Sequence, residues 1–283
     1  MSATESFAHR PATIRASYAT SRDGTPIAYW CTGRGDPILI VHGLGSTHLA
    51  YQAFTQRLAP GFTGCTMDRR GRGESGDTEP YAFEREGEDV AAVAEALGHA
   101  VVLGHSYGGP AAIEAATASE AVRALVLYEA WTSPHSTIPA EDLAAIEELV
   151  SKGRYADAFH YFDSPEEIEE EKQKPDYAVC VAAAPTIPRE IRGWARYWQD
   201  HPLDDQRWRA LDKPVLLLVG ELNADERMPT AVRLADRLPR ATIQLLEGQG
   251  HVAHREDPDQ LARIIRSWLE ATEAAGNDQP GRD

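Results

Sequence analysis

The sequence predicts an α/β protein with a largely parallel sheet, and three observations support this fold class. Residues 37–42 form a short, wholly apolar run of the kind found in strands that are covered on both faces. Similar runs alternate along the chain with segments of helical periodicity, which is the order expected when helices connect parallel strands. At residues 101–118 an apolar run meets Gly-His-Ser-Tyr-Gly and then an alanine-rich segment, which predicts a tight strand-to-helix turn.

Length and charge restrict the class of protein. The chain has 283 residues, enough for one large domain with or without an insertion. Its 44 acidic and 28 basic residues give a net charge of -16, which argues against binding to nucleic acid or to an anionic membrane surface. The sequence shows neither an apolar N-terminal run of the signal-peptide type nor a stretch of membrane-spanning length. We therefore expect a cytoplasmic protein, and the sequence does not indicate its oligomeric state.

The cysteines are few and scattered. Cys31, Cys65 and Cys180 lack the spacing of metal ligands. We expect three unpaired thiols in a reducing compartment, and the sequence predicts no metal and no cofactor.

The first elements predict the edge of the sheet and an anion site. Residues 14–20 and 26–32 alternate in polarity around an Asp-Gly turn, which predicts an antiparallel hairpin. The strand at residues 37–42 ends in His-Gly-Leu-Gly, where the missing side chains let backbone N–H groups converge. The N–H groups of Leu44 and Tyr107 are therefore candidates to bind an oxyanion.

The middle of the chain continues the alternation of helices and strands. Starting with a helix, the alternating elements are expected at residues 49–58, 64–68, 84–97, 100–103, 110–118 and 122–128. The last of these strands ends on Glu129. The arginine-rich and glycine-rich residues 69–76 are isolated in an acidic chain, so we interpret them as a structural loop rather than a nucleic-acid segment.

Residues 130–211 interrupt the alternation of strands and helices and predict a helical cap. Helices are expected at residues 140–152, 154–162, 165–174 and 188–200. Inserted between two strands of a parallel sheet, they would cover the strand ends. Trp194, Tyr197 and Trp198 share one helix face, and together with Trp131 they are candidate substrate-binding residues. The alternative is that this face packs the cap onto the rest of the protein.

The C-terminal part returns to the alternating pattern. Strands at residues 213–219 and 241–246 flank a helix at residues 228–238, and an amphipathic helix follows at residues 258–271. The predicted organisation is an α/β core at residues 14–129 and 212–271, a cap at residues 130–211, and flexible tails at residues 1–13 and 274–283.

Ser106 and His251 form the predicted reactive pair. A serine hydroxyl is a weak nucleophile near neutral pH and needs a base that removes its proton. The turn around Ser106 exposes its hydroxyl, and the following helix directs free N–H groups at the same space. His251 follows a predicted strand in Gly-Gln-Gly-His, where a flexible backbone can bring its imidazole to the serine.

Several motifs, taken in order, resemble the α/β-hydrolase fold superfamily over residues 14–271. They are His-Gly-Leu-Gly, Asp-Arg-Arg-Gly-Arg-Gly-Glu-Ser, Gly-His-Ser-Tyr-Gly-Gly, a helical insertion, Pro-Val-Leu-Leu-Leu-Val-Gly-Glu and Gly-Gln-Gly-His. The resemblance implies an eight-stranded, mostly parallel sheet with an antiparallel second strand, a cap after the sixth strand, and the order nucleophile, acid, histidine. Members with serine at this turn are commonly esterases, lipases, thioesterases, carbon–carbon bond hydrolases or cofactor-free perhydrolases.

The acidic member of the site departs from the pattern of the superfamily. Many members place it after the seventh strand in Gly-x-x-Asp, but this chain has Asn223 there. We favour Glu129, because a residue at a strand end is held more firmly than one in a loop and a buried carboxylate needs a partner. Asp225, in the same loop, is the second candidate. An uncharged pair oriented by Asn223 is the third.

The sequence therefore predicts a serine hydrolase that acts on a hydrophobic ester, lactone or thioester, of medium or large size rather than small and polar, through an acyl-enzyme intermediate. Three alternatives remain open. A carbon–carbon bond hydrolase or cyclase, or a cofactor-free perhydrolase, would use the same serine and histidine. A non-catalytic ligand-binding protein is the third alternative, and the missing aspartate at position 223 motivates it.

Overall fold

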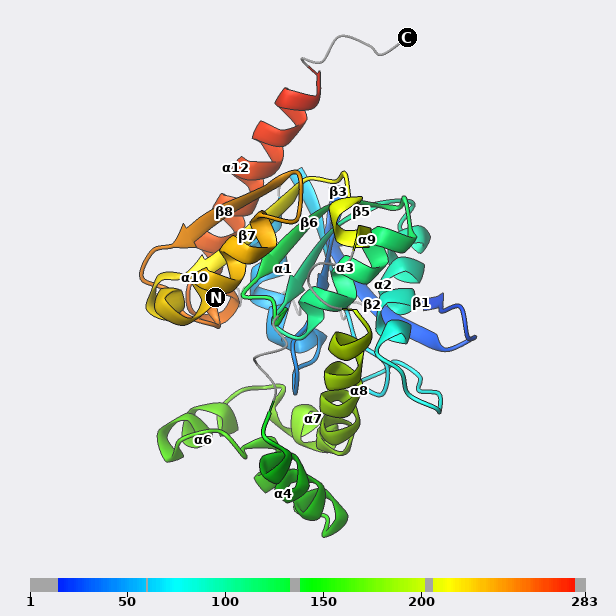
Figure 1. The fold of residues 1–283 in the computed structure, drawn as a ribbon, viewed down its shortest axis with the longest axis vertical. Helices are drawn as coiled ribbons and strands as arrows, with labels where there is room; N and C mark the ends of the chain where they lie inside the picture. Colours follow the sequence, from blue (N-terminus) through cyan, green and yellow to red (C-terminus); the bar gives the residue numbers. More distant parts are fainter. Residues whose placement is uncertain (1–14, 60, 133–137, 202–205, 278–283) are drawn as a thin grey trace, which may run out of the picture.

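The computed structural model describes residues 15–59, 61–132, 138–201 and 206–277. Its sheet has eight strands in the order β1-β2-β4-β3-β5-β6-β7-β8 (Figure 1). The strands are β1 (Ser17–Thr20), β2 (Pro26–Gly33), β3 (Gly35–Val41), β4 (Gly61–Met67), β5 (Ala100–His105), β6 (Val122–Tyr128), β7 (Val215–Gly220) and β8 (Ala241–Leu246). β2 pairs antiparallel with β1 and β4, and every other neighbouring pair is parallel. The predicted fold class is confirmed, including the antiparallel second strand.

Helices cover both faces of the sheet because its inner strands are apolar on both sides. In β3, Ile38 and Ile40 face one helical layer, whereas Leu39 and Val41 face the other. One layer contains α1 (Gln52–Leu58) and α12 (Pro258–Asn277), and the other contains α2 (Glu84–Ala96), α3 (Gly108–Ala118) and α10 (Ala224–Ala235). Shorter helical turns are η1 (His48–Tyr51), η3 (Glu221–Asn223) and α11 (Ala253–Glu256). The parallel strands therefore end together at one edge of a core that is packed on both sides.

The segment between β6 and β7 forms the predicted helical insertion. It contains α4 (Ala140–Ser151), α5 (Tyr155–Phe159), α6 (Pro165–Lys172), α7 (Tyr177–Ala182), η2 (Ala184–Thr186), α8 (Ile187–Asp200) and α9 (Gln206–Arg209). Figure 1 shows α4, α6 and α7 gathered at one end of the molecule, with α8 running from them toward the sheet. The sequence pattern did not indicate α7, because six residues are too few to display a helical period.

The chain ends differ in part from the prediction. α12 continues to Asn277, beyond its expected end at residue 271, so residues 274–277 are helical rather than part of a tail. The rest of the predicted tails, at residues 1–13 and 278–283, lies outside the described residues. In the part of the chain that the structure describes, no helix combines the length and apolar character that a membrane span requires.

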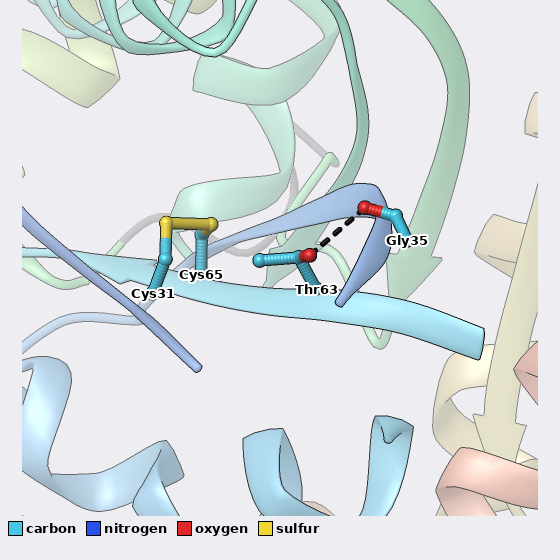
Figure 2. Close-up of a disulfide and its surroundings, with 4 residues drawn as sticks. All are labelled: Cys31, Gly35, Thr63 and Cys65. Atoms are coloured by element: carbon cyan, nitrogen blue, oxygen red, sulfur yellow. Dashed lines mark hydrogen bonds between the residues drawn. A yellow bond between two sulfur atoms is a disulfide. The ribbon is translucent and has the colours of Figure 1, made fainter. Parts of the chain in front are cut away.

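The prediction of three unpaired thiols was wrong. Cys31 on β2 and Cys65 on β4 lie directly opposite each other in the antiparallel register, with Cα atoms 4.1 Å apart, and form a disulfide (Figure 2). Only Cys180 is a free thiol among the described residues, and it is buried. Sequence spacing could not reveal the pair, because the strand register determines it. The thiol argument for a reducing compartment therefore fails, and the cytoplasmic location stays a prediction.

Breaking this disulfide is expected to lower the free energy of unfolding by about 2–4 kcal/mol, because the bond closes a loop that the unfolded chain would otherwise explore. The cysteines are separated by 34 positions. Urea unfolding of the wild type and of the double variant Cys31→Ala, Cys65→Ala measures the difference. Added reductant should destabilise the wild type but not the double variant. Three reactive thiols in denatured, unreduced protein would contradict the prediction.

The arginine-rich loop after β4 is a structural element, as the sequence indicated. The guanidinium groups of Arg69 and Arg72 are fully buried and each lies 2.7 Å from a carboxylate oxygen of Glu190 on α8. Arg69 also pairs with Glu86 on α2, at 2.9 Å. Burial raises the pKa of Glu190, but the charges of Arg69 and Arg72 outweigh it and hold that pKa below its usual range. This cluster joins the cap to the core through charges that have no access to water.

Replacing Glu190 by glutamine should lower the free energy of unfolding by about 3–5 kcal/mol, because Arg72 then keeps a buried charge without its carboxylate partner. Glu147→Gln is the matched control, since Glu147 on α4 pairs with Arg192 on α8, the helix of Glu190, at a partly exposed site. That change should cost no more than about 1 kcal/mol. Chemical denaturation measures both, and equal losses in the two variants would show that burial adds nothing to the pair.

Candidate active site

Ser106 lies on the predicted strand-to-helix turn. β5 ends at His105, α3 begins at Gly108, and Ser106 has a φ of 52°, a conformation that side chains other than glycine rarely adopt. The neighbouring backbones pass very close to this turn. A Cβ at position 104 would lie 2.6 Å from the Cα of Gly109, and one at position 108 would lie 2.4 Å from the carbonyl oxygen of Val41. Glycine is therefore required at both positions.

Glu129 lies at the end of β6 and binds His251. Its Oε2 accepts a hydrogen bond of 2.6 Å from Nδ1 of the imidazole, and its Oε1 accepts one of 3.0 Å from the backbone N–H of Gly220. The side-chain amide of Asn223 donates to both oxygens, at 3.1 and 3.2 Å. Burial raises the pKa of Glu129, but these donors, His251 above all, hold it below its usual value. The carboxylate is thus ionised and can orient the histidine.

The other two candidates for the acid have different positions. Asp225 is exposed in the first turn of α10. Asn223 binds Glu129, as described above, so its amide supports the carboxylate. The structure therefore brings Glu129 to His251, and Asn223 occupies the place where many superfamily members have the acid.

The two predicted oxyanion donors, the N–H groups of Leu44 and Tyr107, belong to segments that adjoin Ser106. Gly43 is adjacent to the nucleophile, since a Cβ on it would lie 3.1 Å from the Cβ of Ser106, and Leu44 lines the same cavity as Ser106. Tyr107 stands directly before α3. Among the described residues, no protein acceptor is hydrogen-bonded to the N–H of Leu44 or Tyr107. Both therefore stay candidates to bind an oxyanion.

Ser106 and His251 line one cavity of about 430 Å³. Its apolar side is formed mainly by Leu44, Ile146, Ala158, Phe159, Phe162 and Ile187. Its charged side carries Asp163, Glu167, Glu170, Glu171, Lys174, Arg255 and Glu256. The cavity lies between the strand ends and the helical insertion, and its volume suits a small organic molecule.

The predicted aromatic wall lies elsewhere and requires a correction. Trp194, Tyr197 and Trp198 are at most 3% exposed and pack in the core, where Trp194 and Tyr197 contact Phe83. Trp131 packs against Trp194 with ring centroids 5.6 Å apart and borders a separate cavity of about 20 Å³. None of the four lines the cavity of Ser106. The helix face therefore packs the cap onto the core, which was the alternative interpretation.

The residues that do line the apolar side come mostly from separate helices of the insertion. Ile146 lies on α4, Phe159 on α5, and Ile187 at the start of α8. No single helical period connects them, so sequence periodicity offered no signal for this wall. Only the way the insertion folds back on itself brings these side chains together.

A sheet of this topology, with a serine, a histidine and a carboxylate at its strand ends, is the architecture of the α/β hydrolases. Residues 38–264 match the model of the alpha/beta hydrolase family. The chain belongs to this family.

Relatives with known sequences or structures agree with this assignment. A crystal structure of an alpha/beta hydrolase from Sphaerobacter thermophilus shares 32% identity with a TM-score of 0.77, covering 89% of this chain and 100% of that one. A 2-(acetamidomethylene)succinate hydrolase from Mesorhizobium japonicum is 25% identical over 272 residues, covering 84% of this chain and 90% of the relative. A thermophilic esterase from Thermogutta terrifontis, at 23% identity and a TM-score of 0.71, shares the fold and covers 91% of this chain and 98% of that one.

Proposed function

We propose that the chain is a serine hydrolase that cleaves a small hydrophobic ester, lactone or thioester through an acyl-enzyme intermediate. The observation that carries this proposal is the 2.6 Å hydrogen bond between Glu129 and His251, at a cavity that His251 shares with Ser106. A carboxylate that holds Nδ1–H leaves Nε2 of the imidazole free to accept a proton. A non-catalytic protein would have no need for this arrangement.

The reaction proceeds in two halves. His251 takes the hydroxyl proton of Ser106 while the serine oxygen attacks the acyl carbonyl, and the N–H groups of Leu44 and Tyr107 stabilise the oxyanion. Collapse of this intermediate breaks the bond to the alcohol or thiol, which takes the proton from His251. Water then attacks the acyl-enzyme by the same route, and the acid is released while Ser106 regains its proton.

The two sides of the cavity favour a substrate with an uncharged, apolar acyl group. The apolar side offers surface to an alkyl or aryl chain, and each buried CH₂ contributes about 0.8 kcal/mol, or roughly fourfold in kcat/KM. The charged side carries five carboxylates and two basic groups, so it repels an anionic substrate. A dicarboxylate of the kind named for the Mesorhizobium relative would therefore be disfavoured here.

A fluorophosphonate probe tests the nucleophile directly. Folded protein should gain one probe mass on the peptide that contains Ser106, and heat-unfolded protein should gain none, because the reaction needs the assembled site. A folded protein that takes no label on Ser106 would remove the proposed mechanism.

A panel of p-nitrophenyl esters tests the substrate class. We expect kcat/KM to rise with the length of a neutral acyl chain until the cavity is full, and the hemisuccinate ester to react more slowly than the butyrate. A preference for the hemisuccinate would contradict the argument from charge. Product analysis on diketones tests for a carbon–carbon bond hydrolase or cyclase. A halide-oxidation assay with peroxide and a carboxylic acid tests for a perhydrolase.

A further inference from the structure

Two side chains that directly precede Ser106 and Glu129 in the chain support the loop of His251. His105 ends β5, and Tyr128 ends β6. The two residues are partners in the register of these parallel strands, and their rings stack with centroids 4.8 Å apart. Both are at most 5% exposed. They form one buried, stacked surface against which the loop can be held.

His105 binds the backbone of His251 itself. Its Nε2 lies 2.8 Å from the carbonyl oxygen of His251, and its Nδ1 lies 2.6 Å from the hydroxyl of Tyr51. Because a carbonyl can only accept, Nε2 carries the proton and Nδ1 accepts from Tyr51. Burial, followed by the charges of His251 and His254, lowers the pKa of His105 well below its usual range. The ring stays neutral, and Tyr51 preserves the tautomer that binds the loop.

Tyr128 binds the residues on either side of His251. Its hydroxyl donates to the carbonyl oxygen of Gly250 and accepts a hydrogen bond of 3.0 Å from the N–H of Ala253. The loop is therefore attached to β6 at two points and to β5 through His105 at a third. These are the strands that carry Glu129 and Ser106 at their ends.

The imidazole of His251 also lies against the same two rings, with its centroid 4.6 Å from that of His105 and 6.4 Å from that of Tyr128. Its side chain is 38% exposed, so close packing does not restrain it on all sides. Its hydrogen bond to Glu129 fixes one nitrogen but leaves the position of the loop undetermined. The backbone attachments therefore decide where the other nitrogen lies relative to Ser106.

We propose that His105 and Tyr128 are positioning residues that hold the backbone of His251 so that its imidazole stays between Ser106 and Glu129. The inference rests on the proposed function of Ser106 and His251. Neither residue exchanges a proton with the substrate. A displacement of about 1 Å in such a site can lower the rate about 100-fold, so the loss of one attachment should act on kcat and leave substrate binding intact.

Tyr128→Phe is the first test, because it keeps the stacked ring and removes only the hydroxyl. We expect kcat to fall by about 10-fold to 100-fold with KM unchanged. His105→Gln keeps an N–H donor and should retain more activity than His105→Leu. Tyr81→Phe is the matched control, since its hydroxyl bonds the side chains of Glu86 and Tyr107, and neither belongs to the loop of His251. A kcat for Tyr128→Phe equal to that of Tyr81→Phe would overturn the proposal.

A double-mutant cycle separates positioning from general stability. In a His251→Ala background the imidazole is absent, so Tyr128→Phe should leave the small residual rate unchanged. A loss of the same factor with and without His251 would show that Tyr128 acts only on the fold, and would overturn the inference.

Proton NMR provides a test that does not depend on activity. The Nδ1–H of His251, bonded to Glu129, should give a downfield resonance that disappears in Glu129→Gln. We expect this resonance to persist in Tyr81→Phe and to broaden or vanish in Tyr128→Phe. An unaltered resonance in Tyr128→Phe would contradict the positioning role. A wild type that shows the resonance but takes no phosphonate label and cleaves no ester would refute the proposed function instead.

Discussion

Replacing Ser106 by alanine is expected to lower kcat for ester hydrolysis by about 10⁶-fold, the loss seen when the nucleophile of a serine hydrolase is removed. The variant lacks the oxygen that forms the acyl-enzyme, while the N–H groups of Leu44 and Tyr107 keep a small residual rate. The Cβ remains, so the backbone at φ 52° carries the same strain and the fold should persist. Steady-state kinetics on a p-nitrophenyl ester, with a thermal melt of both proteins, measure the effect.

Ser46→Ala is the control for this change, because Ser46 also lines the cavity but lies outside the strand-to-helix turn. It should retain most of the activity. A Ser106→Ala variant with wild-type turnover would show that any observed hydrolysis proceeds without this serine. The family fold would then stand, and the proposed mechanism would not.

Glu129→Gln should lower kcat by about 10⁴-fold, by the same reasoning that applies to the amide of the triad acid in serine proteases. Gly220 and Asn223 both donate to the carboxylate, so a glutamine NH₂ group meets a donor in either orientation. Where it faces His251, the ring must present an unprotonated Nδ1 and carry its proton on Nε2. That tautomer cannot accept the proton of Ser106.

Asp225→Asn is the matched control for the position of the acid. Its carboxylate is exposed, and we expect its removal to leave kcat unchanged. If Asp225→Asn lost activity while Glu129→Gln kept it, the loop after β7 would carry the acid after all. Kinetic comparison of the two variants at one pH decides between them.

Glu129 should also affect how the free energy of unfolding changes as the pH becomes acidic. Its pKa in the folded protein lies below the ordinary value of 4.5, so the ionised carboxylate contributes stability above that pH. The contribution is lost as the pH falls through the folded-state pKa. Glu129→Gln removes it, so the variant should be less stable at neutral pH and lose less stability on acidification. Urea unfolding between pH 3 and about 7 measures the free energy of unfolding of both proteins. Parallel pH dependences for the wild type and Glu129→Gln would contradict the prediction.

The local chemistry of the site could be read from single stretches of sequence. An apolar run followed by Gly-x-Ser-x-Gly predicts the turn at Ser106, because a Cβ at either glycine position would lie within 2.6 Å of a neighbouring backbone atom. Glu129 could be proposed because it ends a strand, and a buried carboxylate requires donors. Both residues directly follow a strand, and a short sequence pattern is enough to show where that strand ends.

Features that depend on two distant segments were harder to predict. The stripe of Trp194, Tyr197 and Trp198 is visible in the sequence, but its partner is the core surface near Phe83 rather than a substrate. Cys31 and Cys65 pair because β2 and β4 are neighbours in a given register. Periodicity shows that a face is apolar and gives no information about what covers it.

The sequence by itself determined the α/β class and the order of the strands and their connecting helices, and it indicated the candidate serine and histidine, because each depends on local patterns of polarity and on glycine. Only the tertiary structure decided which carboxylate meets His251, which side chains line the cavity, and which cysteines bond. Those outcomes depend on distances between residues far apart in the chain, and strand register and helix packing set these distances.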